Sequence, residues 1–182
     1  MAYRNGTYIA FHANGIKEPT ESDIRYYNLL KAWHANEDVN FSFIDSHEKT
    51  GAIRDFSKRL TIAASLKKRL RNSKNMVLIV GKTTREDTDW VPLEIEYAID
   101  VCEIPIVAAY PGYRRISAPQ ELAHLWPSAL DKRVSNKTAH VIHVPFCREP
   151  VHDAIQQFSH DNLPKGGLSY YDNAAYRSWG LL

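Results

Sequence analysis

Four carboxylates lie within residues 90–103, and one of them is set apart from the other three. On a helix with about 100° per residue, Glu96, Asp100 and Glu103 fall on the solvated side, opposite the core face. Glu94 falls on one edge of that core face instead, in the first turns of the helix. A carboxylate in this position either pairs with a neighbouring group or faces a ligand, where it can oppose a developing positive charge.

The segment that carries this carboxylate is predicted to be a buried strand, a polar loop and a helix. Residues 76–80 are apolar and rich in β-branched side chains, and such a run without alternation is typical of a strand covered on both faces. Residues 81–89 are polar, as expected of a functional loop. Thr88 or Asp89 can cap a helix that begins at Trp90. The spacing of apolar residues predicts a core face made of Val91, Ile95, Ala98, Ile99 and Cys102.

Strands and helices alternate along the rest of the chain. Strands are expected near residues 7–11, 39–44, 76–80, 104–109 and 138–144, and helices near residues 23–35, 55–72, 119–125 and 150–158. Leu29, Leu60 and Ala64 are expected on the inner faces of their helices. This alternation predicts an α/β fold, a five-stranded parallel sheet with helices on both faces in the flavodoxin-like order 2-1-3-4-5. Residues 1–160 form the predicted domain, and residues 161–182 form an aromatic-rich tail that packs on it or serves assembly.

Composition and charge exclude several classes of function. The net charge is +2 and no basic run resembles a nucleic-acid-binding arm, so we expect no nucleic-acid partner. Two cysteines in 182 residues indicate reduced thiols rather than a disulfide framework. No stretch has the length and apolarity of a signal peptide or a membrane span. These observations predict a cytoplasmic protein without a membrane partner.

The motifs of several common enzyme classes are missing from the sequence. His140 and His143 lie on one predicted strand without the cysteines or carboxylates of a metal site, so no metal is expected. Cys147 has no base beside it, which argues against a thiol nucleophile. The chain has neither a Walker loop nor a Gly-x-Gly-x-x-Gly motif, which disfavours a P-loop nucleotidase and a Rossmann dehydrogenase.

Polar segments follow the first three predicted strands at residues 12–15, 45–47 and 81–89. The carboxyl ends of parallel strands meet at one edge of the sheet, and ligands bind there at the point where the strand order reverses. In the order 2-1-3-4-5 that point lies between the first and third strands. Glu94 lies near the start of the helix after the third strand, so the sequence predicts a ligand site that includes it.

Several of these stretches resemble one protein family. The heptapeptide at residues 89–95, Asp-Trp-Val-Pro-Leu-Glu-Ile, resembles the Trp-x-x-x-Glu stretch of TIR domains. Residues 8–12, Tyr-Ile-Ala-Phe-His, resemble the first strand of the TIR-like proteins of Thoeris bacterial antiphage defence. Residues 43–46 and 77–81 fall where that family has its second and third strand ends. The resemblance covers roughly residues 6–110, and the loop motif of many adaptor-type TIR domains is missing after the second strand.

This resemblance implies an NAD nucleosidase or ADP-ribosyl cyclase with Glu94 as its catalytic residue. NAD would be the substrate, so no cofactor is expected. The implied product is ADP-ribose or a cyclic isomer of it, sensed by a separate effector protein, and the implied enzyme assembles as a homo-oligomer. Two alternatives stay open: a non-catalytic TIR-like interaction module, and a nucleoside deoxyribosyltransferase-like enzyme that acts on nucleosides.

Six further residues are candidates for contacts with the substrate: Phe11, His12, Asp45, Ser46, Lys82 and Trp90. Phe11 either stacks on a base or ends the core of its strand. His12 and Lys82 contact ribose or phosphate, or they are solvated surface residues. For Asp45 and Ser46 the alternative is a capping role, and for Trp90 it is packing at the start of its helix.

Overall fold

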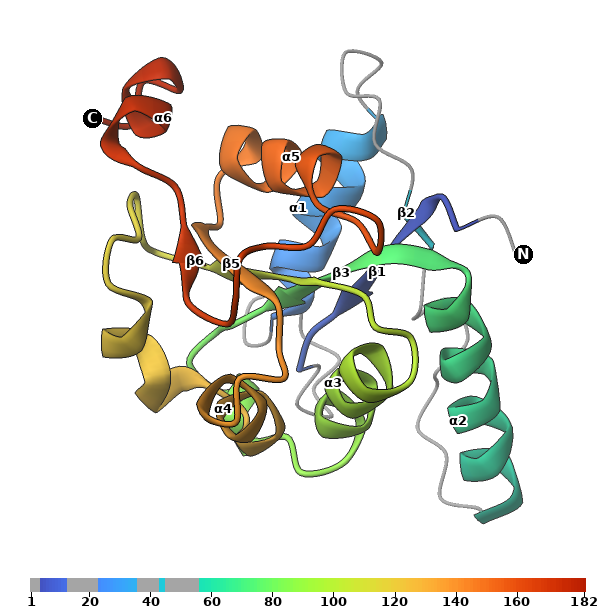
Figure 1. The fold of residues 1–182 in the computed structure, drawn as a ribbon. Helices are drawn as coiled ribbons and strands as arrows, with labels where there is room; N and C mark the ends of the chain where they lie inside the picture. Colours follow the sequence, from blue (N-terminus) through green and yellow to red (C-terminus); the bar gives the residue numbers. More distant parts are fainter. Residues whose placement is uncertain (1–3, 13–22, 36–42, 45–55) are drawn as a thin grey trace.

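The computed structural model describes residues 4–12, 23–35, 43–44 and 56–182, and within them the strands form a six-stranded sheet (Figure 1). The strands lie in the order β2-β1-β3-β4-β5-β6, and every neighbouring pair is parallel. Their bounds are β1 Gly6–Ala10, β2 Phe43–Ile44, β3 Ser73–Ile79, β4 Ile106–Tyr110, β5 Val141–Pro145 and β6 Ser169–Tyr170. The first five strands have the predicted order, which confirms the α/β fold class.

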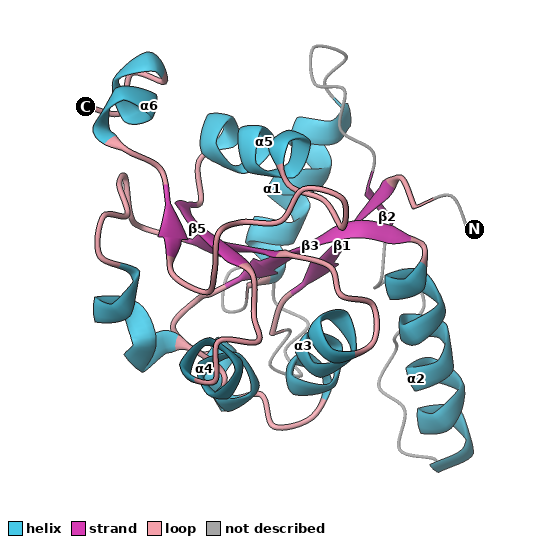
Figure 2. Cartoon of the chain, in the orientation of Figure 1, coloured by secondary structure: helices cyan, strands magenta, loops and turns pink. Residues whose placement is uncertain are grey.

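Helices cover both faces of the sheet, and each face has its own core (Figure 2). On one face lie α1 (Ile24–Ala35) and α5 (Arg148–Gln157). On the other lie α2 (Phe56–Arg71), α3 (Trp90–Asp100) and α4 (Ser128–Ser135). Successive side chains of a strand point to opposite faces, so every residue of β4 and β5, and every residue of β3 except the half-buried Lys74, is buried on one side or the other.

The helix that carries Glu94 begins at Trp90, as predicted, but its cap differs from the prediction. The side chain of Asp89 makes no capping hydrogen bond and instead forms an ion pair with Arg59 of α2. The carboxylate of Asp87 takes the capping role, because its Oδ1 accepts hydrogen bonds from the backbone N–H groups of Asp89 and Trp90 at 2.8 and 2.9 Å. The predicted core face of α3 is buried throughout.

The inner faces predicted for two other helices were partly wrong. Leu60 of α2 is 59% exposed and Ala64 is exposed, whereas Leu66 and Leu70 near the end of the helix are buried. Figure 1 shows why: α2 approaches the sheet at its C-terminal end, and its beginning extends away from the body of the molecule. Leu29 of α1 is likewise exposed.

The sequence prediction also missed a strand and a helix in the C-terminal part. Strand β6 adds a sixth member to the predicted five-stranded sheet by pairing with β5. Ser169 is half-buried and Tyr170 is exposed, so these two residues form no buried apolar run by which a strand is recognised. Helix α4 falls in a stretch that was predicted to be irregular.

The segment 161–182 packs against the body of the protein. It contains β6 and the short helix α6 (Asn173–Ser178), whose Tyr176 is fully buried. The Tyr176 hydroxyl accepts a hydrogen bond from the N–H of Ile116 and donates one to its carbonyl oxygen, at 3.1 and 3.2 Å. Across the described ranges, no helix combines the length and apolar character that crossing a bilayer requires.

Candidate functional site

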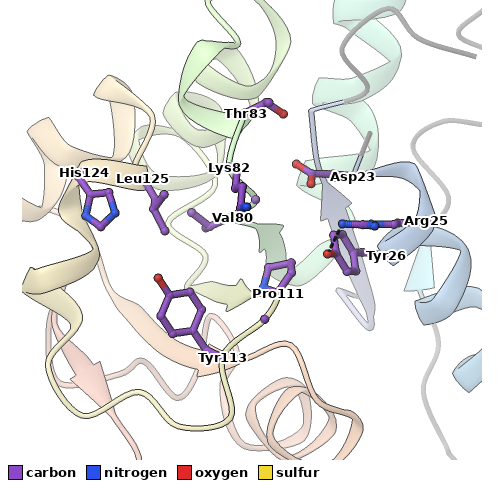
Figure 3. A pocket seen from close by; sticks show the side chains of 12 residues that line it. Asp23, Arg25, Tyr26, Val80, Lys82, Thr83, Pro111, Tyr113, His124 and Leu125 are labelled. Atoms are coloured by element: carbon purple, nitrogen blue, oxygen red, sulfur yellow. Dashed lines mark hydrogen bonds between the residues drawn. The ribbon is translucent and has the colours of Figure 1, made fainter. Parts of the chain in front are cut away.

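The carboxyl ends of β1, β3 and β4 meet at one edge of the sheet, where the strand order reverses between β1 and β3. A hollow of about 590 Å³ opens at this edge, between the start of α1 and the 3-10 helix η2 (Pro119–Leu125) (Figure 3). That volume lies within the range of about 300–1,000 Å³ typical of small-molecule sites. It is lined by Asp23, Arg25, Tyr26, Val80, Gly81, Lys82, Thr83, Pro111, Gly112, Tyr113, His124 and Leu125.

The charges in this hollow suit a ligand that carries both anionic and hydroxyl groups. Arg25 and Lys82 supply two cations, and a single carboxylate, that of Asp23, stands among the lining residues. Tyr26 and Tyr113 bring aromatic rings to opposite sides of the hollow (Figure 3). Arginine binds phosphate oxygens through paired N–H donors, and tyrosine rings offer stacking surfaces for bases.

Glu94 is buried rather than at the boundary predicted for it. Its side chain is 2% exposed among the apolar residues of the α3 face, and it is not one of the lining residues of the hollow. The hydroxyl of Tyr8, a fully buried residue of β1, donates a hydrogen bond to Glu94 Oε1 at 2.6 Å. Residues 86 positions apart thus form one buried polar pair in the α3-side core.

Burial controls the protonation of Glu94. Desolvation raises the pKa of its carboxyl from 4.5 to about 8, although the hydrogen bond from Tyr8 lowers it, and the nearby carboxylate of Asp87 raises it further. The group is therefore predominantly protonated at neutral pH. Perturbed carboxyl groups of this kind concentrate at functional sites, because keeping a charge out of water destabilises a fold unless it serves a purpose.

The predicted substrate-binding residues are not all brought together. Lys82 lines the hollow and is exposed. Phe11 is buried and stacks on the ring of Tyr27 at 5.0 Å, so it packs as a core residue after β1. Trp90 is half-buried against the α3-side core, with the guanidinium of Arg59 5.6 Å from its ring centre.

The other predicted contacts cannot all be placed. His12 follows β1 at the functional edge, and its Nδ1 is buried without a hydrogen-bond partner among the described residues. Asp45 and Ser46 lie outside the described residues.

Sequence reasoning missed most of the lining residues: Asp23, Arg25, Tyr26, Tyr113 and His124. Two signals pointed to some of them. Asp23 directly precedes α1, and Tyr113 follows β4 at the same sheet edge as the loops already singled out. His124 carries no such signal, because only the tertiary fold brings η2 over the edge. The position of the His124 side chain depends on η2, which lies far from β3 in the sequence.

A second buried hydrogen-bonded chain crosses the opposite half of the sheet. The indole Nε1–H of Trp126 donates to the Tyr110 hydroxyl at 2.8 Å, and Tyr110 donates to His143 Nδ1 at 2.7 Å. His143 Nε2 donates to the carbonyl oxygen of Gly167 at 2.9 Å, which fixes the tautomer of a neutral ring. Burial lowers the pKa of His143 to about 4, and the bond to Gly167 raises it. No group of three or more metal-ligating side chains occurs among the described residues.

A model of the protein family described as Thoeris protein ThsB, TIR-like domain, matches residues 8–116, more than half of the chain. The matched segment contains both Tyr8 and Glu94, together with Asp23, Arg25 and Lys82 of the hollow. The match confirms the resemblance inferred from the heptapeptide around Trp90 and from the ends of the first three strands. The chain therefore belongs to the family of TIR-like domains of the Thoeris protein ThsB.

Proposed function

We propose that this protein cleaves the nicotinamide–ribose bond of NAD, with Glu94 as the carboxylate that opposes the developing positive charge. Membership of the ThsB family supports a role in Thoeris antiphage defence. The observation that carries the proposal is the buried Glu94 carboxyl near the beginning of α3, held by a hydrogen bond from Tyr8 of β1 in the α3-side core. A carboxyl group in a water-poor environment acts more strongly on a nearby charge than the same group in solvent.

Breaking this bond needs little acid–base chemistry from the protein. The reaction passes through an oxocarbenium-like cation, as glycoside hydrolysis does, and nicotinamide leaves as a neutral base without being protonated. Glu94 must be ionised to stabilise that cation, so its proton passes to solvent water before the bond breaks. The Tyr8 hydroxyl remains as a donor that steadies the resulting carboxylate.

The hollow offers contacts for the remainder of a dinucleotide. Arg25 and Lys82 are placed to meet the pyrophosphate, and the tyrosine rings of Tyr26 and Tyr113 are placed to meet a base. Because Glu94 is buried and is not itself a lining residue, the substrate reaches it only when the packing around Glu94 and Tyr8 opens. If the open state is a minor one, the apparent activity is reduced by its population. We therefore expect self-association to raise specific activity, and dilution to lower it.

The acceptor of the ribosyl cation decides the product. Attack by water gives ADP-ribose, whereas attack by an adenine or ribose atom of the same molecule gives a cyclic ADP-ribose isomer. Cyclisation requires a pocket that folds the dinucleotide back on itself and excludes water. Either product would act as a signal that a separate effector protein senses.

The test is incubation of concentrated protein with NAD, followed by mass identification of the products. Release of nicotinamide with a stoichiometric ADP-ribose or cyclic product supports the proposal. Nicotinamide riboside serves as a second substrate, because a site that binds both halves of a dinucleotide should cleave it far more slowly than NAD. Equal rates on the two would favour a nucleosidase instead.

One observation favours a second function, that of a non-catalytic interaction module. The Glu94 carboxyl is buried and protonated near neutral pH, as a purely structural carboxyl would be. Such a module would consume no NAD at any protein concentration, and replacement of Glu94 by Gln would leave its partner binding unchanged. NAD turnover that disappears in the Gln variant would eliminate this alternative.

A further inference from the structure

Asp23 is the carboxylate that faces the hollow, and nothing in the proposed chemistry uses it. It directly precedes α1 and is only 6% exposed, yet it lines the hollow (Figure 3). Its backbone carbonyl accepts the N–H groups of Tyr26 and Tyr27 at the start of the helix. The side chain makes a different contact, with Thr84 of the loop after β3.

Two residues of the loop after β3 fix the Asp23 carboxylate. Thr84 Oγ1 lies 2.9 Å from Asp23 Oδ2 and accepts a hydrogen bond from the N–H of Gly81 at 2.8 Å. A Cβ at position 81 would lie 2.1 Å from Asp23 Oδ1, so only glycine leaves room for the carboxylate. Oδ1 has no hydrogen-bond partner among the described residues. One carboxylate oxygen is thus anchored while the other stays available to a ligand.

The surroundings of Asp23 contain cations that do not neutralise it by direct contact. Burial raises the pKa of its carboxyl, while the hydrogen bond with Thr84 and the nearby charges of His12 and Arg25 lower it. Neither cation forms an ion pair with Asp23 in the described part of the chain. A ligand suited to this hollow therefore carries anionic groups for Arg25 and Lys82 and hydrogen-bond donors for Asp23.

We propose that Asp23 is a substrate-binding residue that accepts hydrogen bonds from ribose hydroxyls of a nucleotide whose phosphates lie against Arg25 and Lys82. This assignment rests on the proposed function and separates two roles. Glu94 stabilises the cation at the reacting bond, and Asp23 binds the ribose hydroxyls. NADP carries a phosphate in place of one ribose hydroxyl of NAD. A carboxylate that binds ribose hydroxyls disfavours this phosphate, because two negative charges then meet in a poorly solvated site. The site should accordingly prefer NAD to NADP.

Kinetics of two variants test this division of roles. Asp23→Asn keeps the size of the side chain and an oxygen for Thr84, so its melting temperature should match that of the parent. We expect KM for NAD to rise about tenfold with little change in kcat, as when one charge-assisted hydrogen bond is lost. The preference for NAD over NADP should shrink by a similar factor. Glu86→Gln removes an exposed carboxylate from the loop after β3 and is the matched control. It should change neither KM for NAD nor the preference for NAD over NADP.

Equilibrium binding separates this inference from the proposed function. The probes are ADP-ribose and inorganic pyrophosphate, titrated by calorimetry into the parent and into Asp23→Asn. Weaker binding of ADP-ribose with undiminished binding of pyrophosphate supports the assignment, even if the parent never consumes NAD. Unchanged binding of ADP-ribose overturns it. Equal weakening of both probes also overturns it, because Asp23 would then act only by shaping the loop.

A further arm leaves Asp23 unchanged. In the Glu94→Gln variant, used here to prevent turnover, the affinities for NAD and NADP should differ by about tenfold or more in favour of NAD, since like charges disfavour NADP. Equal affinities, or tighter binding of NADP, would contradict the proposal that the Asp23 carboxylate binds the ribose hydroxyls.

Discussion

Two buried polar constellations, one in each half of the sheet, join a strand tyrosine to an ionisable side chain. In the C-terminal half, Trp126, Tyr110, His143 and the carbonyl of Gly167 form a chain in which each buried N–H or O–H has an acceptor. In the N-terminal half, Glu94 receives one hydrogen bond from a tyrosine, and no cation pairs with it among the described residues. Both ionisable groups are neutral at pH 7, but they reach neutrality by opposite shifts of pKa.

The difference separates a structural network from a group kept for chemistry. A fully satisfied buried network stabilises the fold and specifies one arrangement of its members. Glu94 instead holds a proton that the unfolded chain would have released, so its burial lowers stability near neutral pH. An element that destabilises the fold without structural compensation is a candidate for function. The comparison predicts that substitutions in the two constellations will have opposite consequences for stability and turnover.

The largest expected effect is on turnover. Glu94→Gln keeps the volume and the hydrogen bond from Tyr8 but removes the charge, and loss of such electrostatic stabilisation lowers the rate by about 10²–10³. The measurement is NAD consumption at saturating substrate, with the melting temperature as a check of folding. His143→Gln is the matched variant in the other constellation, and its specific activity per folded molecule should stay near that of the parent. Near-parental turnover in folded Glu94→Gln would contradict the catalytic assignment.

The pH dependence of stability should next distinguish the two groups. The folded pKa of Glu94, about 8, exceeds its ordinary 4.5, so its contribution to stability is lost as pH rises through that window. The folded pKa of His143, about 4, is below 6.5, so its contribution is lost as pH falls through that window. Over its full window the effect is about 5 kcal/mol for Glu94 and about 3.5 kcal/mol for His143, since one pKa unit corresponds to about 1.4 kcal/mol.

Urea unfolding at pH 5, 6.5 and 8 measures both effects. Glu94→Gln should gain stability relative to the parent as pH rises, because the variant has no proton to lose. His143→Gln should gain relative to the parent as pH falls below 6.5. Parallel curves for the parent and both variants would show that neither group is linked to folding.

A smaller loss of stability is expected when the satisfied network is interrupted. Tyr110→Phe leaves the Trp126 indole N–H without its acceptor and His143 Nδ1 without its donor. A buried polar group left without a partner costs about 1–3 kcal/mol. Tyr113→Phe, at a more exposed tyrosine whose ring is 6.1 Å from that of Tyr110, is the control and should be near neutral. Equal unfolding free energies for the two variants would deny the network its structural role.

The smallest effect concerns the partner of Glu94. Tyr8→Phe removes the hydrogen bond that lowers the pKa of Glu94, so that pKa should rise. Because turnover needs ionised Glu94, kcat of the parent should rise as pH increases through about 8. In Tyr8→Phe this rise of kcat should occur at higher pH, while KM for NAD stays near its parental value. Tyr97→Phe, on the same helix but bonded to Arg71, leaves Glu94 untouched and serves as the control. A pH–rate profile that coincides with that of the parent would remove Tyr8 from the mechanism.

The sequence allowed the scaffold of the site to be predicted, because the relevant signals are local. The apolar run before Gly81 and the spacing along α3 placed the strand, the start of the helix and the isolation of Glu94. The burial of Glu94 was missed because it depends on the hydroxyl of Tyr8, which lies far away in sequence. Asp23 was missed because the residues around it were interpreted only as the beginning of a helix.

Errors elsewhere have the same cause. Leu60 fits an amphipathic pattern, but α2 meets the sheet only near its C-terminal end, so the tertiary arrangement overrides the pattern. His124 reaches the hollow because η2 folds over the sheet edge, and no local spacing encodes that approach. Residues 169–170 form a strand because β5 offers an unpaired edge, not because their own sequence favours one.

The C-terminal elements also bear on what the family match means. The matched residues end at Ile116, shortly after the end of β4, yet β4 pairs along its whole length with β5, and α5 covers Val107 and Ala109. The buried Tyr176 is bonded to Ile116 itself, the last matched residue. A fragment cut at that residue would bare a strand edge and an apolar face, which favours aggregation. The segment that the family model matches is therefore shorter than the segment whose strands and helices pack into the sheet and its two cores.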